Sequence, residues 1–254
     1  VVGFAAVGIG MEAIKWSKVG DIVMSWVITP VIAGFIAFMI FQTVHHLILK
    51  QEDPLAKAKR YVPFYMFITA FVLTLVTIKK GLKHVGLDLN DTEAYSYAAL
   101  AGVIVALIGA FFISKIKGDK KKEKEFHFYT VERVFAVLMV ITASGLAFAH
   151  GSNDVANAVG PVAAIVSTAQ TGLVAAKSGI QTWILLLGGI GIVIGLATFG
   201  VRVIRTVGQK ITHLTPSRGF AAELAASTTI VVASGTGMPI STTQTLAGAV
   251  LGVG

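Results

Sequence analysis

Apolar residues form long uninterrupted runs along this chain, and four of the runs have the length of a membrane-spanning helix. No Asp, Glu, Lys or Arg occurs in four ranges: Ile22–Leu49, Val62–Ile78, Ala94–Ser114 and Ser178–Val201. A helix needs roughly 20 mostly apolar residues to cross the hydrocarbon core of a bilayer. The pattern therefore predicts four transmembrane helices at these positions.

Two further apolar runs are too long for one straight spanning helix. Val134–Ala176 contains a single charged residue, Asp154, and Gly219–Gly254 contains only Glu223. Each run has turn-forming residues near its middle: Gly151, Ser152 and Asn153 in the first, and Gly235, Thr236, Gly237 and Pro239 in the second. We expect both to be discontinuous or re-entrant helices, because irregular backbone at membrane depth survives only inside protein or beside water. Such breaks are typical of the binding sites of transporters.

The composition agrees with an all-α polytopic membrane protein. Hydrophobic residues make up 55% of the chain and charged residues only 13%, whereas about 25% are charged in an average soluble domain. The net charge of +8 lies mostly in short clusters between apolar runs, so it indicates cytoplasmic loops rather than nucleic-acid binding. The chain has no cysteine, which excludes disulfides, thiolate metal ligands and cysteine nucleophiles.

Lys and Arg in the loops predict an orientation and a division of the chain. Residues 50–60 contain four of them and residues 115–125 contain six, so we expect both loops in the cytoplasm. Three segments follow: residues 1–114 with the first spanning helices, a basic linker at 115–129, and residues 130–254 with the two broken runs.

Oxygen-bearing side chains gather around the acid of the first broken run. If a helix begins near Ser152, then Asn153, Asp154 and Asn157 share one arc of its surface. Carboxylate and amide oxygens are ligands for hard cations, and a carboxylate inside a bilayer costs at least about 2.5 kcal/mol unless it is compensated. The cluster predicts a site for Na⁺ or a proton. The alternative is that Ser152 or Asn153 caps the helix and Asp154 complements its dipole.

Hydroxyl groups gather at the second break. Ser241, Thr242 and Thr243 follow Pro239, where a new helix is expected to begin with unpaired backbone N–H groups. Hydroxyls and free amides at a helix N-terminus form an anion site suited to phosphate or sulfate. The alternative is that these hydroxyls bond within their own helix. For Glu223, a functional role competes with an interfacial position or an ion pair with Arg218.

Three ordered motifs resemble those of the inorganic phosphate transporter family. Residues 151–157 are similar to its Gly-small-Asn-Asp-Val-small-Asn signature, and residues 239–243 to its Pro-Ile-Ser-Thr-Thr element. Residues 214–220, followed by Glu223, resemble the segment that lies between these two in the family. The resemblance covers nearly the whole chain. It implies two inverted repeats, with the first repeat's signature lying before Val1 and further helices after Gly254.

The resemblance also implies a role for each motif residue. Phosphate would be held by Ser241, Thr242 and Thr243 with Asp154. The cation would be held by Ser152, Asn153, Asp154, Asn157 and Gln244. Glu223 would support coupling between the two. Many members have His where this chain has Gln244, which cannot titrate near neutral pH, so Na⁺ is favoured over H⁺ as the coupling ion.

The resulting hypothesis is a cation-coupled phosphate symporter working by alternating access, without enzyme activity and without a cofactor. Its expected partners are inorganic phosphate, Na⁺ or H⁺, the lipid bilayer and a second copy in a homodimer, but no nucleic acid. A sulfate transporter of the same build is an alternative. A membrane-embedded hydrolase using His150, Asp154 and Ser241 is disfavoured, because no aspartyl dyad, Gly-x-Ser-x-Gly elbow or His-Glu-x-x-His motif accompanies them. A purely structural scaffold leaves the lone acid and the hydroxyl triplet unexplained.

Overall fold

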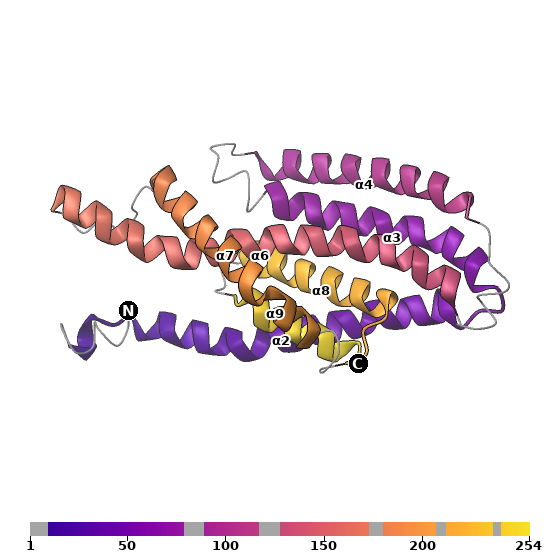
Figure 1. The fold of residues 1–254 in the computed structure, drawn as a ribbon, viewed down its shortest axis with the longest axis horizontal. Helices are drawn as coiled ribbons and strands as arrows, with labels where there is room; N and C mark the ends of the chain where they lie inside the picture. Colours follow the sequence, from indigo (N-terminus) through magenta and orange to yellow (C-terminus); the bar gives the residue numbers. More distant parts are fainter. Residues whose placement is uncertain (1–9, 79–88, 117–127, 173–179, 207–211, 236–239) are drawn as a thin grey trace.

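The described part of the protein is built almost entirely of helices (Figure 1). The computed structural model describes residues 10–78, 89–116, 128–172, 180–206, 212–235 and 240–254. Within them no strand occurs. The α-helices are α2 (Trp16–Val44), α3 (Pro54–Val76), α4 (Asp91–Ser114), α6 (Tyr129–Thr171), α7 (Thr182–Thr206), α8 (Pro216–Gly235) and α9 (Thr242–Gly252). A 3₁₀ turn, Met11–Ala13, precedes α2, and a π-helical turn, His45–Leu49, follows it.

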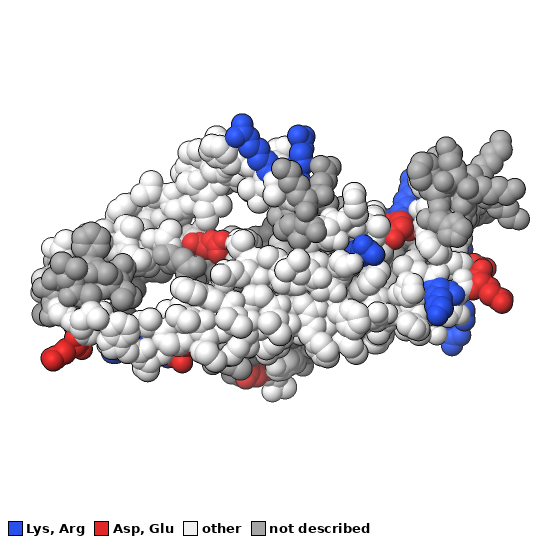
Figure 2. All heavy atoms as spheres, turned by 90° about the horizontal axis from the view of Figure 1, so that it is seen from below, with Lys and Arg blue, Asp and Glu red and all other residues white. Residues whose placement is uncertain are grey.

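The four predicted spanning helices are confirmed. They correspond to α2 with its π-helical turn, α3, α4 and α7, and the segment Tyr129–Phe148 of α6 is a fifth helix long and apolar enough to cross a membrane. Large apolar side chains such as Val27, Leu107 and Val193 are about two-thirds exposed on these helices. Such surface is stable only against lipid or further protein. The chain is therefore an integral, multi-pass membrane protein, and Figure 2 shows the broad uncharged surface expected of one.

Local sequence signals set the starts of two spanning helices. Asp53 caps α3 by accepting a hydrogen bond from the backbone N–H of Ala56 at 3.0 Å, and Pro54 occupies the first helical position, where no N–H is needed. Asn90 and Glu93 form a capping box at the start of α4.

The side chain of Lys59 reaches the carbonyl oxygen of Ser114 at 3.1 Å. The basic loop after α2 and the end of α4 therefore lie at the same end of the molecule, although the cytoplasmic side remains a prediction.

Two apolar clusters hold the helices together. The first joins α2, its π-helical turn, α3, α4, α6 and α8 around Phe135 and Phe220, whose rings lie 5.7 Å apart. The second joins α2, α6, α8 and α9, and it consists largely of alanines such as Ala33, Ala225 and Ala249. Small side chains let helices approach closely where lipid removes the hydrophobic drive for association. The second cluster therefore fixes α9 against α2 and α8.

Glycines make the contact between α2 and α9 unusually close. A Cβ atom added at Gly248 would run into the backbone of Pro30, and one added at Gly252 would run into the backbone of Gly34. A Cβ at Gly34 would lie 2.9 Å from the carbonyl oxygen of Gly248. The two backbones thus touch without side chains between them, which holds the second half of α9 against α2.

The expected break at Gly151–Asn153 is wrong. Helix α6 runs without interruption from Tyr129 to Thr171 and passes through Gly151. One glycine inside a helix costs only about 1 kcal/mol relative to alanine, and no proline lies at this position to remove a backbone hydrogen bond. The helix therefore continues through the polar cluster, and the cluster lies on its side rather than at its start.

The second expected break is confirmed. Helix α8 ends at Gly235 and α9 begins at Thr242. Residues 236–239, which include Pro239, lie outside the described residues. Helix α9 runs antiparallel to α8, because Gly254, just after the end of α9, lies beside Thr212, just before α8.

Replacing Gly248 by alanine should destabilise the protein. The new methyl group would meet the backbone of Pro30, which cannot move as a side-chain tip can, so we expect a loss of about 1–3 kcal/mol and a lower midpoint of thermal unfolding in detergent. Gly195→Ala on α7 is the matched control, since nothing lies within 4 Å of its added Cβ. Equal midpoints for the two variants would contradict the close contact.

Candidate functional site

Asp154 joins the two sequence motifs. The Oγ1 hydroxyl of Thr242 donates a hydrogen bond to Asp154 Oδ1 at 3.1 Å, across 88 positions of sequence. The other oxygen, Oδ2, lies 2.6 Å from Nε2 of His150, one turn earlier on α6. Thr242 is buried, whereas the His150 and Asp154 side chains are about one-third exposed. The acid of the first motif therefore contacts the hydroxyl-rich start of α9 directly.

The three hydroxyls at the start of α9 have different surroundings. Ser241 is the N-cap residue, and its hydroxyl accepts a hydrogen bond from the backbone N–H of Gln244 at 3.4 Å. Thr245 bonds back to the carbonyl oxygen of Ser241 at 2.8 Å. Thr243 and Gln244 are exposed. Bonding within the helix, the alternative considered above, thus describes Ser241 and Thr245 but not Thr242.

Three predicted cation ligands are placed only by their backbone. Ser152, Asn153 and Asn157 belong to helix α6, but their side chains lie outside the described residues. Helix α6 begins at Tyr129, so the alternative in which Ser152 or Asn153 caps a helix start is wrong. Their roles as cation ligands stay predictions.

Glu223 lies apart from the Asp154–Thr242 contact. Its carboxylate accepts a hydrogen bond from the hydroxyl of Thr142 on α6. Thr142 precedes Asp154 by three turns, a distance of about 18 Å along a helix. Arg218, the suggested ion-pair partner, instead lies over the ring of Phe41 at 5.4 Å and donates to the carbonyl oxygen of His213. The structure therefore does not bring Glu223 and Asp154 together in one cluster.

A cavity of about 600 Å³ opens beside Glu223. Arg205 of α7 and Leu246 and Val250 of α9 are among its lining residues, with Met139 of α6. Ser227, one turn beyond Glu223 on α8, is fully buried, and its hydroxyl has no hydrogen-bond partner among the described residues. Glu223 thus lines an open cavity, whose α7 wall includes the largely exposed Val203 and Ile204.

Sequence reasoning missed two contributors to contacts of this kind and assigned a third to another role. It named His150 only as a member of the disfavoured hydrolase, although a position four residues before Asp154 lies one turn away on a helix. Thr142 gave no signal, since it meets Glu223 across 81 positions. Glu132, in the first turn of α6, accepts hydrogen bonds from the backbone N–H and the hydroxyl of Ser217 at 2.9 and 2.7 Å. It therefore caps the start of α8, where a negative charge also complements the helix dipole.

Comparison with known proteins identifies the family of the chain. Residues 1–254 match the model of the phosphate transporter family. The chain belongs to the phosphate transporter family. The "Putative phosphate permease" of Haemophilus influenzae is 52% identical over 258 residues, which cover all of this chain and 60% of that relative. A relative of the same description from Pyrococcus abyssi is 41% identical and is covered to 61%.

A solved structure described as "The sodium-dependent phosphate transporter" has the same fold. It superposes with a TM-score of 0.82 at 35% identity, covering 99% of this chain and 61% of that one. The family resemblance read from the motifs is thereby confirmed. The chain spans about 60% of the length of these relatives, and the inverted repeats stay a prediction.

Removing the carboxylate of Glu132 should loosen the start of α8. Glu132→Ala deletes both acceptors of Ser217, and we expect a loss of about 1–2 kcal/mol, the usual effect of a lost helix cap. Glu132→Gln keeps one carbonyl acceptor and should lose less. Thermal unfolding in detergent measures both, and an alanine variant as stable as the unmodified protein would rule out the cap.

Proposed function

We propose that the protein is a secondary transporter that carries inorganic phosphate together with Na⁺. The observation that carries the proposal is the hydrogen bond between Thr242 and Asp154, which joins an anion-binding helix start to an acid in a chain of the phosphate transporter family. The name of the similar solved structure, a sodium-dependent phosphate transporter, supports both halves of the proposal.

The start of α9 supplies the phosphate half of the site. Its first backbone N–H groups have no acceptor within the helix and carry the positive end of the helix dipole. The hydroxyls of Ser241, Thr242 and Thr243 lie in the same turn and add donors. A phosphate oxyanion is the ligand such a turn binds best, and in this proposal the donation from Thr242 to Asp154 is exchanged for donation to phosphate.

Asp154 supplies the cation half. A carboxylate beside a doubly charged phosphate in a medium of low dielectric is strongly unfavourable unless a cation lies between them. Na⁺ would supply that compensation if Asp154 held it together with Asn153 and Asn157, which belong to the same helix. Neither ion then binds well without the other, and this mutual dependence is what couples their transport.

Proton coupling is the second candidate, and it draws support from His150. Its Nε2 lies 2.6 Å from the Asp154 carboxylate, so a protonated imidazole there would also neutralise the acid. The two candidates differ in what they require. Na⁺ coupling requires Na⁺ in the medium, whereas proton coupling sustains uptake in potassium medium under an inward proton gradient.

Glu223 supports coupling from a separate position in this proposal. Glu223 lines the cavity described above, and its carboxylate oxygens are suitable ligands for a cation there. Because Glu223 is about three helical turns from Asp154, it acts on the cation's path rather than on bound phosphate. Alternating access would then expose these two positions in turn to the two sides of the membrane.

The alternatives have less support. A sulfate transporter would share the anion site, but the family and the relatives named above all concern phosphate. A hydrolase would need Ser241 as a nucleophile activated by His150, yet the Ser241 hydroxyl accepts from the backbone of its own helix and His150 is engaged by Asp154.

Asp154→Asn in the full-length transporter should abolish Na⁺-stimulated phosphate uptake. The amide keeps the size and one acceptor for Thr242 but lacks the charge that binds a cation. Uptake of radiolabelled phosphate into proteoliposomes measures the effect, with Asp21→Asn as control because Asp21 is exposed near the start of α2 and pairs with Lys18. Normal Na⁺-stimulated uptake by Asp154→Asn would refute the cation role.

Ser241→Ala combined with Thr242→Ala should weaken phosphate binding more than Na⁺ binding. Each lost hydroxyl removes a hydrogen bond to a charged ligand, worth about 1.5–3 kcal/mol, so the apparent KM for phosphate should rise at least tenfold. Thr198→Ala is the control, since that hydroxyl bonds only along its own exposed helix. A larger change in the Na⁺ dependence than in the phosphate dependence would reverse the two assignments.

A further inference from the structure

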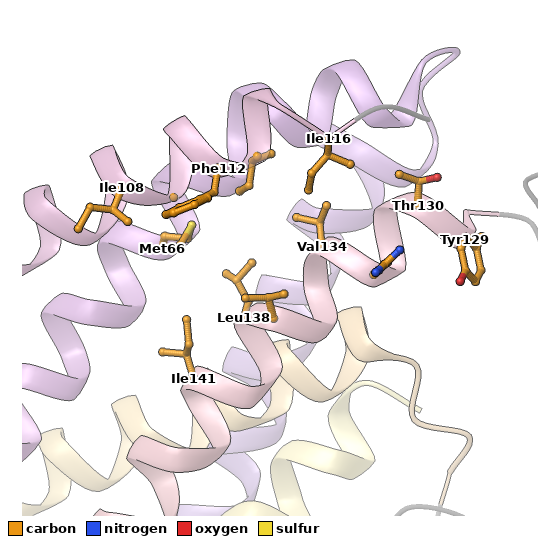
Figure 3. Close-up of a pocket in the computed structure, with 13 residues that line it drawn as sticks. Met66, Ile108, Phe112, Ile116, Tyr129, Thr130, Val134, Leu138 and Ile141 are labelled. Atoms are coloured by element: carbon orange, nitrogen blue, oxygen red, sulfur yellow. The ribbon is translucent and has the colours of Figure 1, made fainter. Parts of the chain in front are cut away.

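A second, mostly apolar cavity lies between α3, α4 and α6, away from the proposed transport site. Its volume is about 630 Å³, within the roughly 300–1,000 Å³ typical of small-molecule sites. Met66 of α3, Phe112 of α4 and Leu138 of α6 point into it, as Figure 3 shows. We call this cavity the α4–α6 groove.

The groove opens sideways toward the surrounding lipid. Phe112 and Val137, on its two walls, are 64% and 59% exposed. Gly109 forms part of its floor, where an added Cβ would run into the side chain of Met66. An apolar molecule in the bilayer can therefore enter between α4 and α6 without parting the helices.

Polar groups are confined to one end of the groove. Tyr129 and Thr130, from the first turn of α6, lie at that end in Figure 3. Arg133 follows one turn later and is the single charged residue among those that line the groove. The same end of the molecule holds Lys59, bonded to the end of α4, and Lys115, whose ammonium lies 4.0 Å from the ring of Phe111.

We propose that the α4–α6 groove binds an anionic phospholipid, with an acyl chain along the apolar walls and the headgroup phosphate at Arg133. Basic groups at the end of an apolar cleft between spanning helices are complementary to the phosphate of such a lipid. The apolar length of the groove is complementary to its hydrocarbon chain. An apolar helix in the groove would offer no anion to Arg133, Lys59 and Lys115, whereas a lipid phosphate does, so the charge favours lipid as the occupant.

Native mass spectrometry of the full-length transporter tests the headgroup. Phosphatidylglycerol should be retained in preference to phosphatidylcholine with the same acyl chains. Arg133→Gln should reduce phosphatidylglycerol retention about fivefold, the effect of one basic residue near an anionic headgroup. Arg202→Gln, a cation over Phe199 on α7, is the control and should leave retention unchanged. Equal retention by the Arg133 variant would overturn the proposal.

A pair of tryptophan variants tests the proposed site of the lipid acyl chain. Ile141→Trp should fill the groove and lower retention of both lipids, whereas Val140→Trp, on the adjacent outward face of α6 with 66% exposure, should not. Retention that survives Ile141→Trp would overturn the proposal. Binding of glycerophosphoglycerol, which has no acyl chains, as tightly as the lipid would also overturn it by making Arg133 a site for free phosphate esters.

The mass of the complex identifies the other occupants. A groove filled by a part of the transporter outside this chain, or by a second copy, leaves no bound lipid in the unmodified protein, and the second copy doubles the mass. Either result would overturn the proposal. None of these readouts measures uptake, so a failure of the lipid site is distinguishable from a failure of phosphate transport.

Discussion

A carboxylate inside an otherwise uncharged apolar segment must be compensated, and the arrangement around Asp154 depends on this constraint. Leaving it alone in a bilayer would cost at least about 2.5 kcal/mol. His150 compensates it from the same helix, and Thr242 compensates it from the start of α9. Because Thr242 begins a helix, the contact also places unpaired backbone N–H groups beside the acid. One interaction therefore places the hydroxyl-rich start of α9 and a carboxylate of α6 side by side.

The same kind of contact, a hydrogen bond between a carboxylate and a hydroxyl, recurs along α6. Glu132 meets Ser217 at the start of α8, Thr142 meets Glu223 in the middle of α8, and Asp154 meets Thr242 at the start of α9. In each contact a carboxylate is bonded to a hydroxyl on the facing helix. Lipid gives apolar helices little reason to prefer one register over another. These hydrogen bonds fix the register of α6 against α8 and α9, while the apolar clusters supply contact area.

The sequence predicted the spanning helices and the approach of Asp154 to the hydroxyls at the start of α9, but not the continuous helix through Gly151. The spanning helices could be predicted because a run of about 20 residues without charge is typical of a helix that crosses a membrane. The break expected at Gly151 is wrong because a single glycine costs too little free energy inside a helix to interrupt it. Thr142 could not be predicted as the partner of Glu223, since nothing in single-sequence spacing reports a contact between distant helices. The Gly248-x-x-x-Gly252 spacing was present in the sequence and would have indicated the close contact with α2.

That backbone contact between α2 and α9 has a mechanical consequence. No side chains separate Pro30 and Gly34 from the two glycines of α9. Side chains that could adjust to a shift are therefore missing from this contact, and a displacement of α9 moves α2 as well. The hydroxyls proposed to hold phosphate thus move with α2, whereas Asp154 belongs to α6. In the proposed function, a ligand that bridges Thr242 and Asp154 would tighten the packing of α9 and α2 against α6.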